Sequence, residues 1–276
     1  MVSAMLYPVA SLFLRQAIER GAGLTRVIFI SNFGIAAAFL PLLFAPHEAP
    51  NWPGLGWPLL TGAAFFLGQS FTILAIRVGD VSIQAPIMGT KTVFVAIGAY
   101  FFLAEPVPPA LWVGAGITAV AVFLLGSSDR GGMHTVGRCI VYSLLAAGFY
   151  GITDILVVAH SFDFSAIPFA IIMTGTNAAL SLTLIPTFRK KLGEMRSEAW
   201  TPLVTGSLII GFQAALLFIA LAYYGRATAM NILYSTRGLW GVVIVWSAGA
   251  FFANRELERV GPGVMRKRLA GALLLT

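Results

Sequence analysis

Charged residues are scarce in this 276-residue chain: they make up 11% of it, against 58% hydrophobic residues, and the mean hydropathy is +0.86. A soluble domain of this length would carry far more charge on its surface. There is one cysteine, Cys139, so an intrachain disulfide is impossible. The chain has no H-E-x-x-H, G-x-S-x-G or P-loop motif and no cluster of metal-ligand spacing. These absences predict a polytopic membrane protein that is not an enzyme, with no catalytic residue, metal or cofactor.

The hydrophobic residues fall into ten continuous segments, separated by short connections rich in Gly, Pro and charge. Continuous apolar runs predict helices, because a transmembrane barrel strand alternates apolar and polar residues. We therefore predict an all-α fold with ten transmembrane helices. The segments are 2–18, 24–45, 57–76, 81–104, 109–127, 138–159, 165–187, 200–223, 227–252 and 262–276. The tenth has only about eight apolar residues after Arg268, which cover about 12 Å of helix, so we expect it to be short or truncated.

The net charge of +7 comes largely from one set of connections. The connections after the odd-numbered segments hold fifteen Lys and Arg residues, counted with the adjoining segment ends, and the even-numbered ones hold only Arg226. Basic loops of this kind face the cytoplasm in membrane proteins. The charge thus predicts a membrane orientation with both termini outside, and it gives no reason to expect a nucleic-acid partner.

The chain also contains an internal repeat with an offset of 144 to 146 residues. The matching residues are Asn32 and Asn177, Pro41 and Pro186, Gln69 and Gln213, Gly79 and Gly225, and Thr90-Lys91 and Thr236-Arg237. They predict two five-helix halves, 1–128 and 137–276. Since five is odd, the halves must have opposite orientations, as in secondary transporters whose substrate site lies near the membrane midplane.

Lys91 and Arg237 are the main candidates for a binding site. Each lies about ten residues into its segment, and a basic residue at the centre of a span costs about 2.5–3.5 kcal/mol on insertion scales. The repeat makes the two positions equivalent, which predicts that they face each other across a cavity. Two neighbouring cations repel unless an anion lies between them, so we expect a carboxylate or phosphate group of a substrate there. The alternative is that either residue pairs with a buried acid and only stabilises the fold.

Asp154, in the sixth segment, is the acid available for such a pair, and could instead be a proton-coupling carboxylate. Tyr234 and Trp240 lie three residues either side of Arg237 and so share its helix face, and Met88 has the corresponding place near Lys91. Buried amides in repeat-related positions can bind substrate or connect helices. They are Asn32, Asn177, Gln69 and Gln213. Tyr7 and Tyr150 are weaker candidates.

The order of several short motifs resembles that of a known family. The segments AIRVGDVS, GAYFFLAEPV and WVGAGITAVAVFLL in the first half, and LAYYGRAT, WSAGAFFANRELE and RLAGALLL in the second, are similar to the EamA-type branch of the drug/metabolite transporter superfamily. The resemblance implies ten helices in two inverted repeats, a central cavity and alternating access without ATP. It does not fix a substrate. It also implies termini in the cytoplasm, whereas the loop charges predict the reverse.

We therefore expect a secondary transporter that moves a small organic anion or zwitterionic metabolite, by exchange for a counter-substrate or with proton coupling. The expected location is the inner membrane of a bacterium, with the lipid bilayer as the surrounding partner. An exporter of amphipathic metabolites or drugs is the second interpretation. A membrane scaffold without transport is the third, and it leaves the duplicated central cation unexplained.

Overall fold

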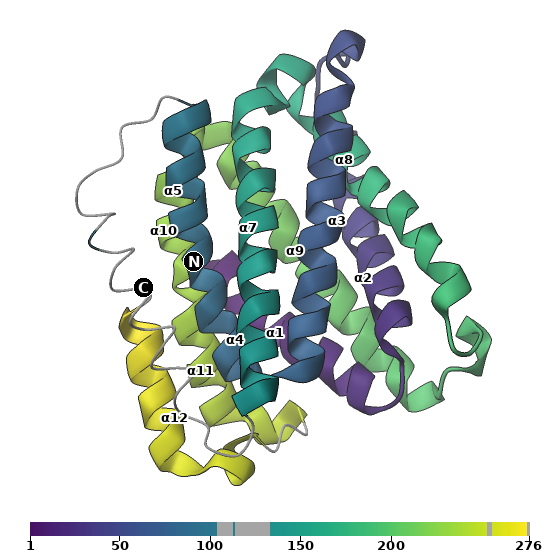
Figure 1. Ribbon diagram of the computed structural model, residues 1–276. Helices are drawn as coiled ribbons and strands as arrows, with labels where there is room; N and C mark the ends of the chain where they lie inside the picture. Colours follow the sequence, from purple (N-terminus) through teal and green to yellow (C-terminus); the bar gives the residue numbers. More distant parts are fainter. Residues whose placement is uncertain (104–112, 114–132, 253–255, 275–276) are drawn as a thin grey trace.

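The computed structural model describes residues 1–103, 113, 133–252 and 256–274, and over these residues the chain forms helices and turns and no strand (Figure 1). The α-helices are α1 (Val2–Glu19), α2 (Leu24–Phe39), α3 (Gly56–Val78), α4 (Val81–Ile87), α5 (Lys91–Phe102), α7 (Met133–Phe164), α8 (Ala166–Ser181), α9 (Ser197–Tyr224), α10 (Ala227–Ser235), α11 (Arg237–Ala248) and α12 (Glu256–Leu274). Short 3₁₀ turns extend α2 to Phe44 and α8 to Thr187 and join α4 to α5.

Six helices of the described residues are long and apolar enough to cross a membrane. They are Leu24–Phe44, Trp52–Val78, Val81–Phe102, Val136–Phe164, Ala166–Thr187 and Ser197–Tyr224. All six coincide with predicted segments, which confirms an all-helical, multi-pass membrane protein. The helices α1, α10 with α11, and α12 occupy three further predicted segments, and the predicted segment 109–127 lies outside the described residues. The total of ten spans remains a prediction.

Two of the predicted segments are broken near the middle. In the segment 81–104, a 3₁₀ turn over Met88–Thr90 separates α4 from α5. Pro86 has no amide hydrogen to donate within α4, which weakens the helix just before this turn. In the segment 227–252, α10 ends at Ser235 and α11 begins at Arg237. Lys91 and Arg237 are thus each the first residue of the second half-helix.

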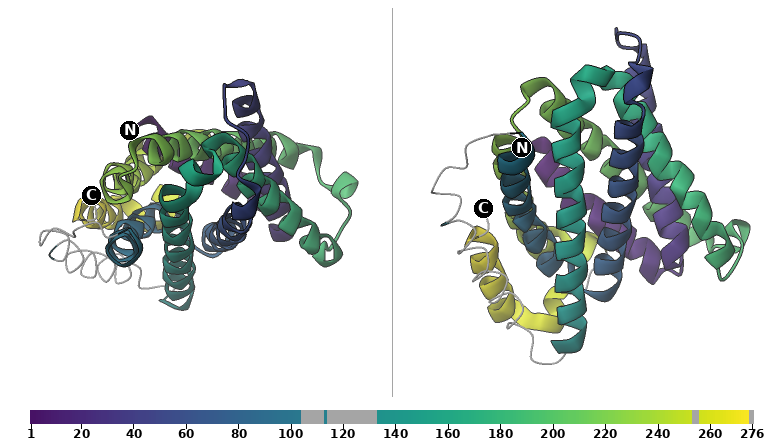
Figure 2. Two further views of the ribbon diagram at one scale, coloured as in Figure 1. Left: turned by 90° about the horizontal axis from the view of Figure 1, so that it is seen from above. Right: turned by 45° about the horizontal axis from the view of Figure 1, so that its top comes forward.

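The helices pack in a pattern that interleaves the two ends of the sequence. The long helices α3 and α7 pack against each other, as do α1 and α9. Viewed along the helices, α11 and α12 lie at one side of the molecule and α8 at the opposite side (Figure 2). The half-helices meet in the α11–α4 and α10–α5 contacts. This arrangement brings the two central cations, 146 residues apart in the sequence, into one region.

Glycine permits the close approach of α11 to α4. A Cβ atom added at Gly238 would lie 2.8 Å from the Cα atom of Pro86, and one added at Gly241 would lie 2.6 Å from the Cβ atom of Ala85. Such distances are shorter than real side chains allow, so this contact depends on the absence of a side chain.

Candidate functional site

Lys91 is buried and has an acidic partner. Its Nζ atom lies 2.5 Å from Oδ2 of Asp154 on α7, and the two side chains are 3% and 6% exposed. The rings of Tyr150 and Tyr234 lie beside the ammonium group, with centroids 5.8 Å and 5.3 Å from Nζ. Lys91 therefore forms an ion pair with a buried acid, which is the arrangement given above as the alternative to an anion site.

Asn231 on α10 completes the surroundings of Asp154. Its Nδ2 atom donates a hydrogen bond to Oδ2 of Asp154 at 2.6 Å and a second to the carbonyl of Ala227. Thr92, next to Lys91, donates to the carbonyl of Asn231 at 3.1 Å. The Lys91–Asp154 pair is thus held by α5, α7 and α10 together.

Arg237 is equally buried, at 2% exposure, and has different neighbours. Its guanidinium carbon lies 4.9 Å from the ring centroid of Tyr7 and 4.2 Å from that of Tyr234. One terminal nitrogen donates to the backbone carbonyl of Met88. Within the described part of the chain, Arg237 forms no ion pair, and its Nε atom is buried without a hydrogen-bond partner. The aromatic faces offset part of the cost of burying this charge, but no carboxylate of a described residue neutralises it.

Hydrogen bonds connect the tyrosines of the site to polar side chains on neighbouring helices. Tyr150 donates through its hydroxyl to Oε1 of Gln69 at 2.6 Å, and Gln69 donates to Ser31 at 3.3 Å. On the other side, Gln84 donates to the hydroxyl of Tyr7 at 2.6 Å. These bonds fix the orientation of two of the three tyrosine rings that face the cations, those of Tyr150 and Tyr7.

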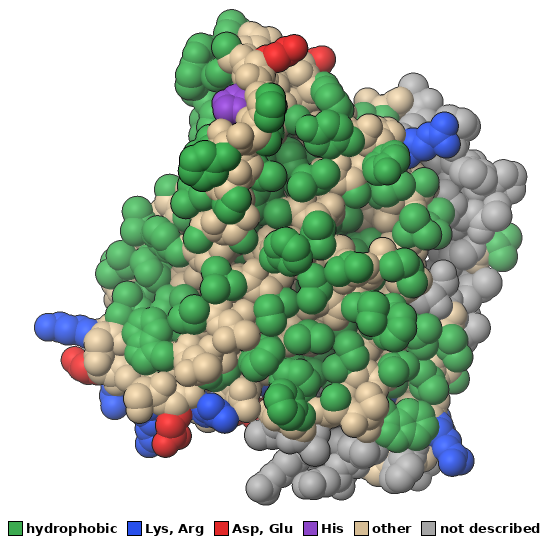
Figure 3. Space-filling view, turned by 180° about the vertical axis from the view of Figure 1, so that it is seen from behind, with side chains coloured by type: hydrophobic (Ala, Val, Ile, Leu, Met, Phe, Trp, Pro, Cys, Tyr) green, Lys and Arg blue, Asp and Glu red, His purple; other side chains and the backbone are tan. Residues whose placement is uncertain are grey.

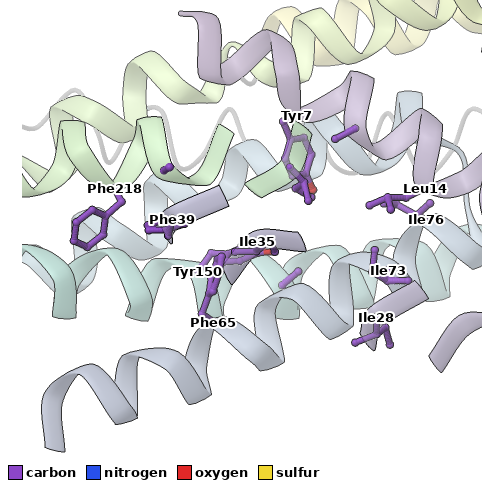
Figure 4. Packing of buried hydrophobic residues seen from close by; sticks show 14 of the residues in the cluster. Tyr7, Leu14, Ile28, Ile35, Phe39, Phe65, Ile73, Ile76, Tyr150 and Phe218 are labelled. Atoms are coloured by element: carbon purple, nitrogen blue, oxygen red, sulfur yellow. The ribbon is translucent and has the colours of Figure 1, made fainter. Parts of the chain in front are cut away.

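A cavity connects both cations. It encloses about 570 Å³ of space not filled by atoms, a volume that includes open solvent at its mouth. Its polar lining comprises Tyr7, Gln69, Lys91, Tyr150, Thr153, Asp154, Gln213, Tyr234 and Arg237. The rest of the wall is apolar, and Figure 4 shows Tyr150 beside Phe65 and Ile35, and Phe39 beside Phe218. Phe39 is the last residue of α2 and Leu221 lies near the end of α9, so the lining extends from the cations toward that end of the bundle.

Six of the ten predicted site residues line this cavity: Lys91, Arg237, Tyr234, Gln69, Gln213 and Asp154. The other four lie outside the lining. Asn32 donates to Ser181 at 2.7 Å as a contact between α2 and α8, and Asn177 is buried on the same contact. Met88 contributes its carbonyl to Arg237, and the indole nitrogen of Trp240 is buried without a partner among the described residues.

The sequence interpretation missed Asn231, Gln84 and Thr153. At an offset of 146 residues, Asn231 matches Ala85 and Gln84 matches Met230, so the repeat gives no signal for these two amides, whereas Thr153 matches Tyr7. A plain inventory of amides inside the segments would have found Asn231 and Gln84.

The fold and site define a class: an integral, multi-pass helical membrane protein with a polar site buried between its helices. Comparison with known families shows which family part of the chain matches. Residues 1–127 match the EamA-like transporter family, which confirms the resemblance for the first half of the chain.

One curated relative is a probable 4-amino-4-deoxy-L-arabinose-phosphoundecaprenol flippase subunit ArnE of Pseudomonas savastanoi pv. phaseolicola (strain 1448A / Race 6). It is 33% identical over 70 residues, which are 25% of this chain and 61% of that relative. The match therefore spans less than two thirds of the relative's length. A solved crystal structure is similar over 99% of this chain and 96% of its own, with a TM-score of 0.57 and 16% identity, which indicates a shared fold alone. The family match and the flippase relative support a membrane transporter of the drug/metabolite transporter type.

Proposed function

We propose that this chain is a secondary transporter, without enzymatic activity, that moves a small organic anion or zwitterionic metabolite through the cavity between its two halves. The observation that carries the proposal is the difference between the two buried cations. Lys91 is neutralised by Asp154, whereas Arg237 lines the same cavity with no acidic partner among the described residues. A buried and unneutralised guanidinium costs several kcal/mol, and an anionic ligand would remove much of this cost.

The repeat places the counterpart of Asp154 on α1, between Tyr7 and Ser11, and this stretch holds no acidic residue. The position 146 residues before Asp154 holds Pro8, on α1. A Cβ atom added at Gly241 of α11 would lie 3.7 Å from the Cβ atom of Pro8. Pro8 therefore packs against α11 at Gly241, four residues after Arg237. An anionic ligand would supply the negative charge that α1 does not provide there.

Pairs of helix contacts support the proposed architecture of two inverted halves, 1–128 and 137–276. The α1–α9 contact corresponds to α7–α3, the α2–α9 contact to α8–α3, and the α1–α11 contact to α7–α5. Each pair exchanges the first half for the second, which is the expected result of a two-fold axis between them. Rocking of one half against the other about the central site would then give alternating access.

Flux measurements in proteoliposomes test the proposed function. A panel of organic acids and zwitterions, as external solute or as internal counter-solute, gives the substrate class and distinguishes exchange from proton coupling through Asp154. Arg237→Gln should abolish the flux and Arg237→Lys should retain part of it, since lysine keeps the charge but not the planar fork. Arg226→Gln, an exposed cation at the end of the bundle, is the control. Full flux in Arg237→Gln would contradict the proposed anion site.

One observation favours a second function, the export of amphipathic metabolites or drugs. Most of the cavity wall is apolar, and it reaches Phe39, Phe218 and Leu221 beyond the cations. In this case the flux should follow the apolar size of the solute rather than its charge, and Arg237→Gln should leave it unchanged.

A further inference from the structure

A second group of buried charges lies away from the cavity, at the turn between α3 and α4. The carboxylate of Asp80 accepts hydrogen bonds from two arginines: Arg268 of α12 at 3.1 Å and Arg15 of α1 at 3.3 Å. The side chain of Asp80 is 4% exposed and that of Arg268 is wholly buried. Its place near the start of the last predicted segment is typical of a loop charge, but Arg268 lies inside α12 and its side chain faces the protein interior.

The two arginines also bind the backbone and a hydroxyl group around this turn. Arg268 donates to the hydroxyl of Ser82 at 2.8 Å, and Arg15 donates to the carbonyl of Gly79 at 2.5 Å. We call Arg15, Gly79, Asp80, Ser82 and Arg268 the Asp80 cluster. It ties α1 and α12 to the first turn of α4, the half-helix that precedes the Lys91 break. A buried ion pair is stabilising only when further hydrogen bonds satisfy its atoms, and the bonds to Ser82 and Gly79 supply part of this requirement.

The position of the cluster relative to the cavity indicates its role. It lies at the end of the bundle where the basic connections gather, here called the basic end, which is the lower end in Figure 3. The cavity lining runs from the central cations toward the opposite end, and no lining residue belongs to α4 or α12 as far as these helices are described. The Asp80 cluster therefore joins the helices that separate the cavity from the basic end.

At the opposite end, the hydrogen bonds between described residues include those of Asn51 and Ser165, and none of them belongs to an ion pair. The repeat relates Gly79-Asp80 to Gly225-Arg226, the turn between α9 and α10. Arg226 is exposed and makes no ion pair with a described residue. In an alternating-access protein, the end that is held closed should carry the stronger contacts. Among the described residues, the ion pairs outside the cavity lie at the basic end.

We propose that the Asp80 cluster is a latch that holds the basic end closed while the cavity extends toward the other end. The bonds of Asp80 to Arg15 and Arg268 break when the protein exposes the cavity to the basic end. The physiological use of this latch rests on the proposed transport function. Its opening is a conformational change that can be measured without any substrate.

The chain contains its own probe for this measurement. Cys139 is its one cysteine, it is wholly buried, and it packs against the turn, since a Cβ atom added at Gly79 would overlap its sulfur. Movement of the turn away from α7 would expose this sulfur. The rate at which a maleimide labels Cys139 in the purified protein therefore reports how often the basic end opens.

We expect Asp80→Asn to increase the labelling rate of Cys139 about 10- to 100-fold, the equilibrium shift that corresponds to one charge-assisted hydrogen bond. Arg15→Gln should give a smaller increase, because Arg268 remains, and Asp80→Glu should restore slow labelling. Asp163→Asn, an exposed carboxylate at the other end of α7, is the matched control and should label like the wild type. Thermal unfolding of each variant, with labelling well below its midpoint, separates opening of the latch from unfolding.

Labelling of folded Asp80→Asn at the wild-type rate would overturn the latch, whatever the flux. If Asp80→Asn accelerates labelling but the wild type moves no solute, the proposed function fails and the latch stands as a conformational lock. Equal acceleration in Asp80→Asn and Asp80→Glu would also overturn the proposal, because it would show that the charge does not hold the turn.

Discussion

The two halves place the same kind of residue at the same point and surround it differently. Lys91 and Arg237 each follow a threonine, each begin a half-helix and each lie near Tyr234. Yet Lys91 has Asp154 at 2.5 Å, whereas Arg237 lies beside two tyrosine rings, donates to the carbonyl of Met88 and has no acidic partner among the described residues. Under the proposed function, the two equivalent cations have different roles: Lys91 stabilises the fold and Arg237 binds the ligand.

The residues that follow the cations differ in a related way. Thr92 donates a hydrogen bond to Asn231, so the Lys91 side is joined to α10 by polar contacts. Gly238 has no side chain, so the Arg237 side approaches α4 by close packing. Substitutions on the Lys91 side should therefore lower stability by removing polar contacts. Substitutions on the Arg237 side should lower it by overpacking, and by a different amount.

The largest effect is expected for Asp154→Ala, which leaves Lys91 buried without its acid. The free energy of unfolding should fall by about 3–5 kcal/mol, measured by denaturant or thermal unfolding in detergent. Lys91→Met combined with Asp154→Leu should recover most of this loss, because no charge is then left unpaired. Asp163→Ala, an exposed acid on the same helix, is the control. If the double variant is as unstable as Asp154→Ala, the ion pair is not the source of the loss.

On the Arg237 side, Gly238→Ala should reduce stability by about 1–3 kcal/mol through overpacking. The added methyl group would lie 2.8 Å from the Cα atom of Pro86, so backbone must move to receive it. Gly148→Ala is the control, since nothing lies within 4 Å of an added Cβ atom there. The unfolding midpoints of the two variants decide this prediction, and equal midpoints would contradict the close α4–α11 contact.

A smaller effect, about 1 kcal/mol, is expected for Asn231→Ala, because hydrogen bonds between membrane helices contribute about this much. Asp154 would lose one donor and keep Lys91. The same unfolding assay measures the change, with Asn51→Ala as a control for an exposed amide. A loss as large as that of Asp154→Ala would show that Asn231, and not Lys91, holds the carboxylate.

The sequence alone predicted the helical class and all six of the long spans, because a bilayer requires apolar runs of this length. It predicted the cation positions through the repeat and named Asp154 as a partner, but it left open which cation Asp154 would pair with. Hydropathy gives the length of a helix and not its rotation about its own axis, so it could not show that Asp154 lies beside Lys91 and that Tyr7 lies beside Arg237.

The breaks before Lys91 and Arg237 were not predicted for a related reason. Both segments stay apolar across the break, and only Pro86 signals one of them. The sequence also contained no sign that the side chain of Arg268 is buried in the protein, because a basic residue near a segment end is ordinarily a loop charge. Each of these features depends on a contact between residues far apart in the sequence.

The smallest effect on stability is expected for Arg237→Met, and this prediction tests the comparison most directly. Since Arg237 has no acidic partner among the described residues, its removal leaves no carboxylate of these residues unpaired. The gain from no longer burying an unneutralised charge opposes the loss of the tyrosine and Met88 contacts, so the free energy of unfolding should stay within about 1 kcal/mol of the wild type. Lys91→Met, which leaves Asp154 buried without its cation, should instead lose several kcal/mol of stability.

The stabilisation by a bound ligand should, in contrast, depend on Arg237. An organic anion at 100 times its Kd should stabilise the wild type by about 2.7 kcal/mol, and this stabilisation should vanish in Arg237→Met. If Arg237→Met is as unstable as Asp154→Ala without ligand, then Arg237 also serves the fold, and the division of work between the two cations is wrong.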